Sequence, residues 1–380
     1  MEDGLDVALY IHIPFCRAKC AYCDFNSYAH LDGVHDQYTD ALVHEIELAP
    51  PLSVRTIYIG GGTPTVLPLS HFASIFGAVR RKFATETTTE ITVEANPGTV
   101  SPGKLAALRS LGVTRLSLGV QSFVDSELRL LGRIHSASEV LKAFQTGRQA
   151  GFDNISLDLL YGLPGQQLAS WRMSLEQALA LQPDHLSLYA LTIEENTPMA
   201  AAISQGHLPT PDPDLAADMY ELAQDMLSDA GFSHYEISNW ARSSEWRCQH
   251  NLTYWRNEAY LGIGAGAHSW LGRRRWSNAL GPEVYSERVR SGRQPIAMDE
   301  TISLEMEMGE TMMLGLRLLD EGVDFGRFQA RFGIDLRLRF ADELRELNQI
   351  GLIETSSERV TLSDRGRLLG NQVFLRFLGD

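Results

Sequence analysis

The stretch Ile13-Pro-Phe-Cys16-Arg-Ala-Lys-Cys20-Ala-Tyr-Cys23-Asp24 directly follows the apolar run 7–13 and decides which fold and which chemistry to expect. A cubane iron–sulfur cluster takes one thiolate for each iron that the protein binds, so three cysteines at this spacing let one short loop hold three irons. The fourth iron then stays open to another ligand. The stretch therefore predicts a [4Fe–4S] cluster on Cys16, Cys20 and Cys23.

A structural zinc ion is the alternative for the same three cysteines. Zinc normally completes a tetrahedron with a fourth protein ligand, and here only the distant Cys248 and His250 offer one. Four cysteines in 380 residues, three of them within eight positions, do not indicate a disulfide framework. The spacing favours the cluster over zinc, and both stay open at this point.

The composition predicts a soluble cytoplasmic protein. The first six residues carry no basic region and no cleavage site, and no apolar stretch approaches the length of a membrane span. With 44% hydrophobic residues, the chain can bury a large core in one large domain and a smaller one. A net charge of −15 argues against binding to a nucleic-acid backbone.

Short β-rich runs alternate with amphipathic stretches of helical period along the first half of the chain. Such a repeat predicts a parallel sheet whose strands all end at one edge. The segment 101–112 shows the expected punctuation of one helix, with Ser101 as N-cap, then a proline, and Gly112 at the end. The predicted strands are 7–13, 56–59, 90–94, 115–118, 154–160 and 185–191.

Each predicted strand is followed by a loop that carries cysteines, glycines or polar residues. In barrel-like α/β folds this edge carries the chemistry. Because no dinucleotide-binding fingerprint follows the first strand, we expect a partial (β/α)6 barrel rather than an open doubly wound sheet. After the cysteine loop come Gly60-Gly-Gly-Thr-Pro64, Glu94-Ala-Asn-Pro-Gly98, Gly119-Val-Gln-Ser122, Asp158-Leu-Leu-Tyr-Gly-Leu-Pro-Gly165 and Tyr189-Ala-Leu-Thr-Ile-Glu194.

The pattern changes twice along the chain, which predicts three regions. Residues 1–208 form the partial barrel. Residues 209–298 close its open side, with a helix near 214–230, then a segment 232–240, and an irregular, aromatic-rich region as far as Trp276. Residues 299–380 form a smaller, mainly helical C-terminal domain with a winged-helix-like layout, which we expect to pack against the barrel or cover it rather than bind DNA.

Together these motifs resemble the radical S-adenosylmethionine (SAM) proteins, whose hallmark is three cysteines spaced as here. Tyr10-Ile-His-Ile-Pro-Phe-Cys16 and Gly60-Gly-Gly-Thr-Pro-Thr65 resemble the anaerobic coproporphyrinogen III dehydrogenase branch of that family. The resemblance implies that the reduced cluster passes an electron to SAM bound at the open iron. It also implies a set of SAM-binding positions: Tyr10, Gly61, Gly62, Thr63, Glu94, Gln121, Arg133, Asp158, Ala190 and His268.

Several of these side chains suit that ligand physically. Glycines let the backbone approach the methionyl end of SAM, Glu94 and Asp158 can accept hydrogen bonds from its hydroxyl or amino groups, and Arg133 can pair with its carboxylate. Taken singly, an acidic residue at a strand end is as often a helix cap or an ion-pair partner.

Two further positions are predicted from their place in the chain. Tyr10 precedes His12 by two residues on one strand, so both should face the same side. Gly262-Ile-Gly-Ala-Gly-Ala-His268 lacks the strand context of a nucleotide-binding loop, so we expect a turn that closes the SAM site, with His268 nearby.

The chain departs from the dehydrogenase pattern in two ways. Phe25 stands where the dehydrogenase has a fourth cysteine, and the long segment that the dehydrogenase carries before its first strand is not found here. Three cysteines still suffice for the cluster, but both differences count against dehydrogenase activity.

The segment Cys248-Gln-His-Asn-Leu-Thr-Tyr-Trp255 contains His-Asn-x-x-Tyr-Trp, which resembles the motif that marks the HemW haem chaperones. In a helix, His250 and Tyr254 share a face. An imidazole is a good ligand for haem iron, Tyr254 and Trp255 can cover a porphyrin face, and Cys248 offers a second ligand. Without the resemblance, an ordinary buried cluster is the simpler interpretation.

The resemblance thus implies a haem chaperone that binds a [4Fe–4S] cluster, SAM and haem and transfers haem to target apoproteins. Respiratory haem proteins are one class of acceptor, and a membrane-bound acceptor would be met by peripheral association. The alternatives are an oxygen-independent coproporphyrinogen III dehydrogenase and a radical enzyme that modifies nucleic acid, which the acidic charge disfavours. Whether the protein is an enzyme stays open, and we assign no catalytic residue.

Overall fold

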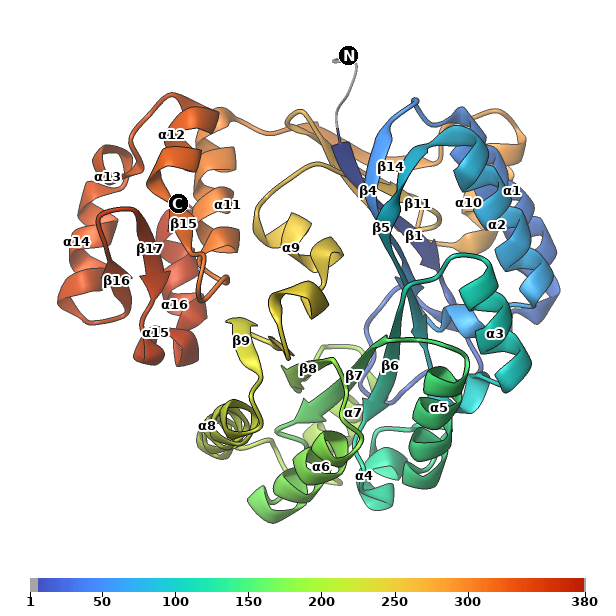
Figure 1. The fold of residues 1–380 in the computed structure, drawn as a ribbon, viewed down its shortest axis with the longest axis horizontal. Helices are drawn as coiled ribbons and strands as arrows, with labels where there is room; N and C mark the ends of the chain where they lie inside the picture. Colours follow the sequence, from blue (N-terminus) through green and yellow to red (C-terminus); the bar gives the residue numbers. More distant parts are fainter. Residues whose placement is uncertain (1–5, 379–380) are drawn as a thin grey trace.

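The computed structural model describes residues 6–378, and within them a curved sheet of twelve strands is the central element (Figure 1). Six neighbouring strands run parallel in chain order and confirm the predicted partial (β/α)6 barrel. They are β1 (Asp6–Ile13), β4 (Ser53–Gly61), β5 (Ala84–Ala95), β6 (Arg115–Gln121), β7 (Asn154–Tyr161) and β8 (His185–Ala190).

β1 lies between β4 and β11 (Tyr260–Ile263) and is parallel to both. Every residue of β1 is buried except Asp6, which is exposed, and Tyr10, which is half-buried. A strand that is covered on both faces is apolar along its whole length, which explains the continuous apolar run from residue 7 to residue 13.

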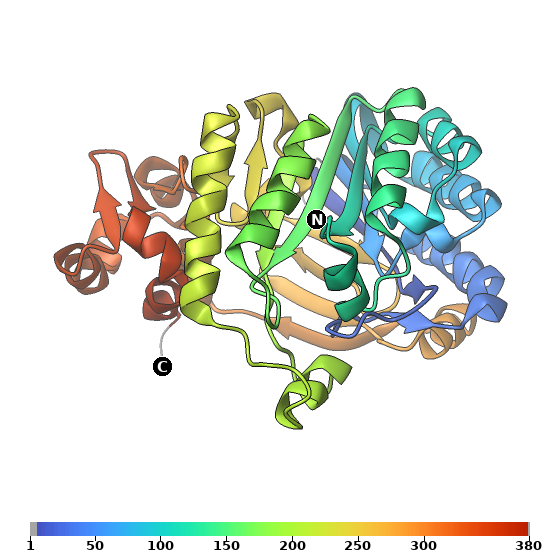
Figure 2. The same cartoon turned by 90° about the horizontal axis from the view of Figure 1, so that it is seen from below.

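Helices between the parallel strands cover the outer face of the sheet (Figure 2). α3 begins and ends as its sequence predicts, because the Ser101 hydroxyl accepts a hydrogen bond from the Lys104 amide at 3.3 Å and Gly112 takes a φ of +96°. The helices as far as the end of the barrel are α1 (His35–Leu48), α2 (Leu69–Lys82), α3 (Pro102–Ser110), α4 (Asp125–Leu130), α5 (Ala137–Gln149), α6 (Leu168–Ala180), α7 (Pro198–Ser204) and α8 (Pro213–Asp229).

The region that we expected to be irregular, after residue 240 and as far as Trp276, instead contributes strands that extend the sheet beyond β1. That expectation was wrong because these strands have four or five residues, too few for a period of two to stand out. The region holds β9 (Ser233–Glu236), β10 (Asn239–Ala241), α9 (Gln249–Trp255), β12 (His268–Leu271), β13 (Arg274–Asn278), α10 (Pro282–Arg290) and β14 (Ile296–Thr301).

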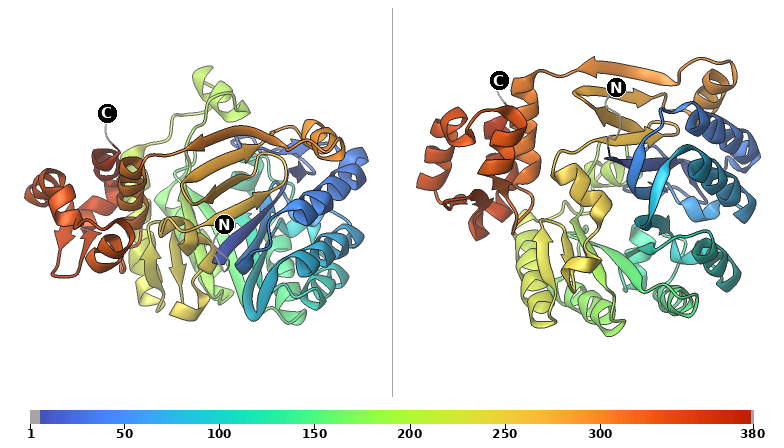
Figure 3. Two further views of the ribbon diagram at one scale, coloured as in Figure 1. Left: turned by 90° about the horizontal axis from the view of Figure 1, so that it is seen from above. Right: turned by 45° about the horizontal axis from the view of Figure 1, so that its top comes forward.

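The C-terminal part has a hydrophobic core of its own, which runs from Met308 to Phe377. β14 leads from the large sheet into it (Figure 3), and its three short strands pair in the order β15, β17, β16. Its elements are α11 (Leu304–Gly315), β15 (Val323–Asp324), α12 (Phe325–Phe332), α13 (Leu336–Arg339), α14 (Ala341–Gln349), β16 (Ile353–Thr355), β17 (Arg359–Leu362), α15 (Asp364–Leu368) and α16 (Gly370–Phe374). Among residues 6–378, none of the helices is long and apolar enough to cross a lipid bilayer.

Glu45 of α1 ties the barrel to its closing region. Its carboxylate accepts hydrogen bonds from the Gly264 amide at 2.9 Å, from the Asn278 side chain at 2.7 Å and from the Tyr285 hydroxyl. Burial raises the pKa of Glu45 from 4.5 to about 7, although these three donors favour the charged form. One carboxyl thus joins α1 to β13, α10 and the turn after β11.

This carboxyl makes a specific contribution to the pH dependence of stability. Between pH 4.5 and about 7 the folded chain holds a proton on Glu45 that the unfolded chain has lost, so the free energy of unfolding falls as the pH rises through this window. The contribution amounts to about 3 kcal/mol. In urea titrations at pH 5 and pH 8, we expect Glu45→Gln to lose this part of the dependence. Glu47→Gln, on the same helix but exposed, should keep it, and equal slopes in both variants would contradict the assignment.

Candidate functional site

The carboxyl ends of the six parallel strands surround a cavity of about 490 Å³. Loops from all six strands line it, as the sequence predicts for a single site at this edge. Of the residues that the sequence singles out, the cavity is lined by Cys16, Cys20, Cys23, Gly61, Gly62, Thr63, Glu94, Gln121, Arg133, Asp158 and Ala190.

The three cysteines line this cavity and are half-buried. Cys16 Sγ lies 3.6 Å from the Thr63 hydroxyl, and Cys23 Sγ lies 3.8 Å from the Ser27 hydroxyl. Burial raises the pKa of the Cys16 and Cys23 thiols, so in this arrangement a metal is needed to keep them as thiolates.

The thiols share one cavity but do not converge on one point. In residues 6–378, no three His, Cys, Asp or Glu side chains gather as the ligands of a single metal ion do. In a cubane each thiolate binds a different iron, so its ligands are spread round the cluster. Cys248 lies instead beside Glu90, with its Sγ 3.7 Å from the carboxylate, and neither Cys248 nor His250 lines the cavity. The four-ligand zinc site is therefore not formed.

Two glycines after β4 leave room at the cluster loop. A Cβ on Gly62 would lie 2.6 Å from the Phe15 carbonyl oxygen and 3.0 Å from Cys16 Sγ. Gly61 has a φ of +114°, and a Cβ there would lie 2.4 Å from the His12 ring. Both positions therefore require glycine, because a side chain at 62 would displace the loop that carries Cys16 and a side chain at 61 would displace the His12 ring.

Glu94, at the end of β5, is a buried acceptor. Its carboxylate accepts hydrogen bonds from the Tyr58 hydroxyl at 2.7 Å and from the Gly61 amide at 3.1 Å. Burial raises the pKa of Glu94 to about 7, with a smaller contribution from Asp158. The Gly61 bond fixes the glycine loop against the end of the neighbouring strand.

Asp158, within β7, lines the same cavity. The hydroxyls of Ser117 and Ser156 donate to its carboxylate at 3.0 Å and 3.3 Å, and burial raises its pKa. Arg115 was missed by the sequence reasoning, because a lone arginine at a strand start gives no signal. It is 2% exposed, lines the cavity, and its Nε has no hydrogen-bond partner in the described part of the chain. A buried unpaired donor of this kind suits an anionic ligand group.

Two further predicted residues come from β6 and the loop after α4. Arg133 donates to the Gly119 carbonyl at 2.6 Å and to Cys20 Sγ at 3.3 Å, so it contacts the cysteine loop directly. Gln121 has a φ of +69°, a strained conformation for a residue with a side chain. Such strain recurs at ligand sites, because it aims a side chain that regular structure would turn away.

A second cavity of about 390 Å³ adjoins the first, and Phe25, Gly61 and Glu94 line both. Tyr10 and His12 lie side by side in its wall, as predicted, with the Tyr10 hydroxyl 3.0 Å from His12 Nδ1. The ring of Phe25 is 66% exposed. The remaining walls come from Asn26, Tyr254, Tyr260, Gly266, Ala267 and His268.

The His-Asn-x-x-Tyr-Trp segment forms α9, as the helical interpretation predicts. His250 is 1% exposed, and both of its ring nitrogens have partners: Nδ1 lies 2.9 Å from the Thr56 hydroxyl, and Nε2 lies 2.9 Å from the Tyr254 hydroxyl. Burial, and to a lesser degree Arg115, lowers the pKa of His250 to about 3. Of the motif, Asn251 reaches the first cavity and Tyr254 the second, whereas His250 and Trp255 line neither.

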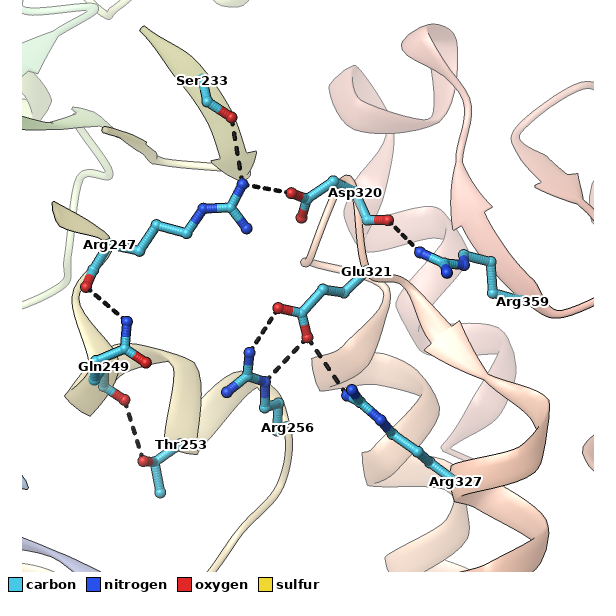
Figure 4. Close-up of polar contacts among 9 residues, drawn as sticks. All are labelled: Ser233, Arg247, Gln249, Thr253, Arg256, Asp320, Glu321, Arg327 and Arg359. Atoms are coloured by element: carbon cyan, nitrogen blue, oxygen red, sulfur yellow. Dashed lines mark hydrogen bonds and ion pairs between the residues drawn. The ribbon is translucent and has the colours of Figure 1, made fainter. Parts of the chain in front are cut away.

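α9 lies between the curved sheet and α11 of the C-terminal part (Figure 1). Figure 4 shows an arginine at each end of the helix that points toward the loop after α11. Arg247 pairs with Asp320 at 2.6 Å, and Arg256 pairs with Glu321 through two contacts of 2.6 Å and 3.0 Å. Burial favours the protonated form of Glu321, but Arg256 outweighs this and lowers its pKa.

Comparison with known proteins agrees with this geometry. Residues 10–178 match the radical SAM superfamily, and residues 302–369 match the HemN C-terminal domain. The heme chaperone HemW of Bacillus subtilis is 39% identical over 376 residues, which cover 98% of this chain and 99% of that protein. The chain belongs to the HemW family of the radical SAM superfamily. The heme chaperone HemW of Mycobacterium tuberculosis is 37% identical over 383 residues, 99% of this chain and 96% of that protein.

A solved structure shows the same fold as this HemW family member. The coproporphyrinogen III oxidase HemN from Escherichia coli, a radical SAM enzyme, superimposes with a TM-score of 0.86 at 24% identity, over 99% of this chain and 90% of that one. The sheet and the C-terminal part therefore occur together in both proteins.

Membership of the radical SAM superfamily implies a [4Fe–4S] cluster and SAM, and the residues present fit both groups. Three thiols share a cavity, a glycine keeps Cys16 clear of the neighbouring loop, and the cation Arg115 lines the same cavity. The described conformation of this HemW family member does not leave His250 free to bind haem iron, because its imidazole is enclosed and both ring nitrogens have partners.

Gly62 offers a test of the cluster loop. We expect Gly62→Ala to bind severalfold less iron and sulfide than the wild type after anaerobic reconstitution, because the added methyl displaces Phe15 and Cys16. Cys16→Ala sets the lower limit. Gly103→Ala is the matched control, since a Cβ at position 103 meets no atom within 4 Å. Full loading of Gly62→Ala would contradict the assignment.

Proposed function

We propose that this protein is a haem chaperone that binds a [4Fe–4S] cluster, SAM and haem, and transfers haem to target apoproteins. The observation that carries the proposal is full-length similarity to proteins named heme chaperone HemW, in a chain whose His-Asn-x-x-Tyr-Trp helix packs beside the cysteine-lined cavity. This combination favours haem handling over the other radical SAM functions.

In this proposal, Cys16, Cys20 and Cys23 hold the cluster and the strand-end residues hold SAM. The reduced cluster, when bound, supplies one electron to SAM. Glu94 and Asp158 act as buried acceptors, Gln121 donates and accepts, and Arg133 or Arg115 pairs with the carboxylate of SAM. The remaining SAM contacts are assigned to Tyr10, Gly61, Gly62, Thr63, Ala190 and His268.

Haem is assigned to the α9 region. His250 is the proposed iron ligand, and Tyr254 and Trp255 lie one turn further along the same helix. The two aromatic rings supply apolar surface of the kind that a porphyrin face requires. Tyr254 lines the second cavity, which adjoins the first, so cargo held there would lie close to the cluster and SAM.

Phe25 favours transfer of haem over decarboxylation of coproporphyrinogen. This exposed ring occupies the position of the dehydrogenase's fourth cysteine and separates the two cavities with an apolar surface. The partners in this proposal are haem and haem-accepting apoproteins, respiratory haem proteins among them, met in the cytoplasm or at a membrane surface. The net charge of −15 is unsuited to nucleic acid.

An anaerobic haem titration of the reconstituted protein, followed by its Soret band, tests the proposal. We expect saturable one-to-one binding that weakens at least severalfold in His250→Ala, because the iron loses its ligand. His207→Ala, an exposed histidine in the segment after α7, is the control and should bind as the wild type does.

Absence of saturable binding in the wild type would remove the proposal. The next measurement would then be conversion of coproporphyrinogen III by the reconstituted protein.

A further inference from the structure

The described conformation encloses the proposed haem ligand. His250 is 1% exposed, and its two ring nitrogens already face the hydroxyls of Thr56 and Tyr254, each at 2.9 Å. An iron ligand needs a free nitrogen lone pair that points at open space. If His250 binds haem, as the proposed function holds, then α9 must first move away from β4.

The barrel side of α9 is held by polar contacts at its first turn. The Glu90 carboxylate accepts hydrogen bonds from the backbone amides of Gln249 and His250, each at 3.1 Å. These two amides have no partner within the helix itself, so Glu90 replaces a missing cap. With seven residues, α9 is too short to persist on its own, and its position depends on its neighbours.

The opposite side is held by the C-terminal part at both ends of the helix (Figure 4). Arg247 stands two residues before α9 and Arg256 directly after it, and they pair with the consecutive residues Asp320 and Glu321. Asp320 is held in turn through its backbone carbonyl, which accepts from Arg359 at 2.9 Å. The loop after α11 therefore forms an ion pair at each end of the helix that carries His250.

The C-terminal part also contacts the end of α9 between these ion pairs. The Arg317 guanidinium lies 4.3 Å from the ring centre of Trp255, and Asn257 donates to the Thr311 hydroxyl at 3.0 Å. The buried Trp255 Nε1 has no acceptor anywhere in residues 6–378. An unpaired buried donor destabilises the enclosed position of α9. The stability of that position therefore depends more strongly on the ion pairs at the two ends of the helix.

We propose that the C-terminal domain is a latch on α9: the pairs Arg247–Asp320 and Arg256–Glu321 hold His250 in its closed position, and haem binds when these pairs separate. The latch thus regulates the site of the proposed function. Because only the open state binds, the apparent affinity for haem equals the intrinsic affinity multiplied by the open fraction. Weakening the latch should therefore strengthen haem binding, whereas weakening an ordinary structural contact would not.

The test uses the full-length reconstituted protein with Asp320→Asn and Glu321→Gln combined, and Glu321→Gln alone as a milder variant. The control is Asp299→Asn, which breaks a pair with Arg274 on β13 and β14 that is bidentate like Arg256–Glu321, at 2.9 Å and 2.8 Å. Hydrogen exchange of the α9 amides measures the release of the helix. Stopped-flow absorbance at the Soret band measures haem association.

We expect faster exchange in α9 and haem association faster by about fivefold for each pair removed, the size of effect that one partly exposed ion pair supports. Asp299→Asn should match the wild type in both measurements. Adding His250→Ala to the double variant should abolish the gain.

Other outcomes overturn the latch. Unchanged exchange in α9 would show that the ion pairs do not hold the helix. Faster exchange with unchanged or slower haem association would show that α9 does not gate the ligand, while haem binding by the wild type would leave the proposed function standing. A gain that survives His250→Ala would place haem elsewhere. No haem binding by the wild type would remove the proposed function itself.

Discussion

The parallel pairing of β1 with β4 on one side and β11 on the other is the constraint on which the rest of the structure depends. Its register sets Ile13 beside Gly61, so the cysteine loop and the glycine loop leave the sheet together. The same register sets Tyr10 opposite Gly262, which brings the second cavity against the first. A shift of one residue would turn Tyr10 and His12 away from the second cavity and separate Cys16 from Gly62.

The barrel was predictable from sequence because its strands are buried on both faces and its helices carry their own punctuation. Asn154 to Leu160 reads as a strand from composition alone, and Ser101 and Gly112 delimit a helix without tertiary information. The strands between residues 260 and 278 escaped prediction because each is short and pairs with a distant or neighbouring strand whose identity the local sequence does not reveal. Tertiary pairing, rather than local preference, decides their conformation.

In the candidate site, too, some residues could be predicted from the local sequence and others could not. Cysteine spacing and glycine runs are local signals, and the structure brings those residues to one cavity. Arg115 gives no local signal, because it reaches the cavity only through the pairing of whole elements. The place of Phe25 in the lining of both cavities also depends on the fold. His250 shows the limit most clearly: the helix was predictable, but its burial against Thr56 was not.

The ion pairs between the C-terminal part and α9 also limit how the C-terminal domain of this chain can be exchanged for another. Tyr254, which lines the second cavity, keeps its place partly through carboxylates that lie more than sixty residues further along the chain. A chimera that joins this barrel to the C-terminal domain of another protein would need the consecutive acidic pair of residues 320 and 321 in order to retain the wall of that cavity. A substitution at Arg247 or Arg256 is thus expected to go with a compensating substitution at residue 320 or 321. This holds although no residue of the loop after α11 lines either cavity.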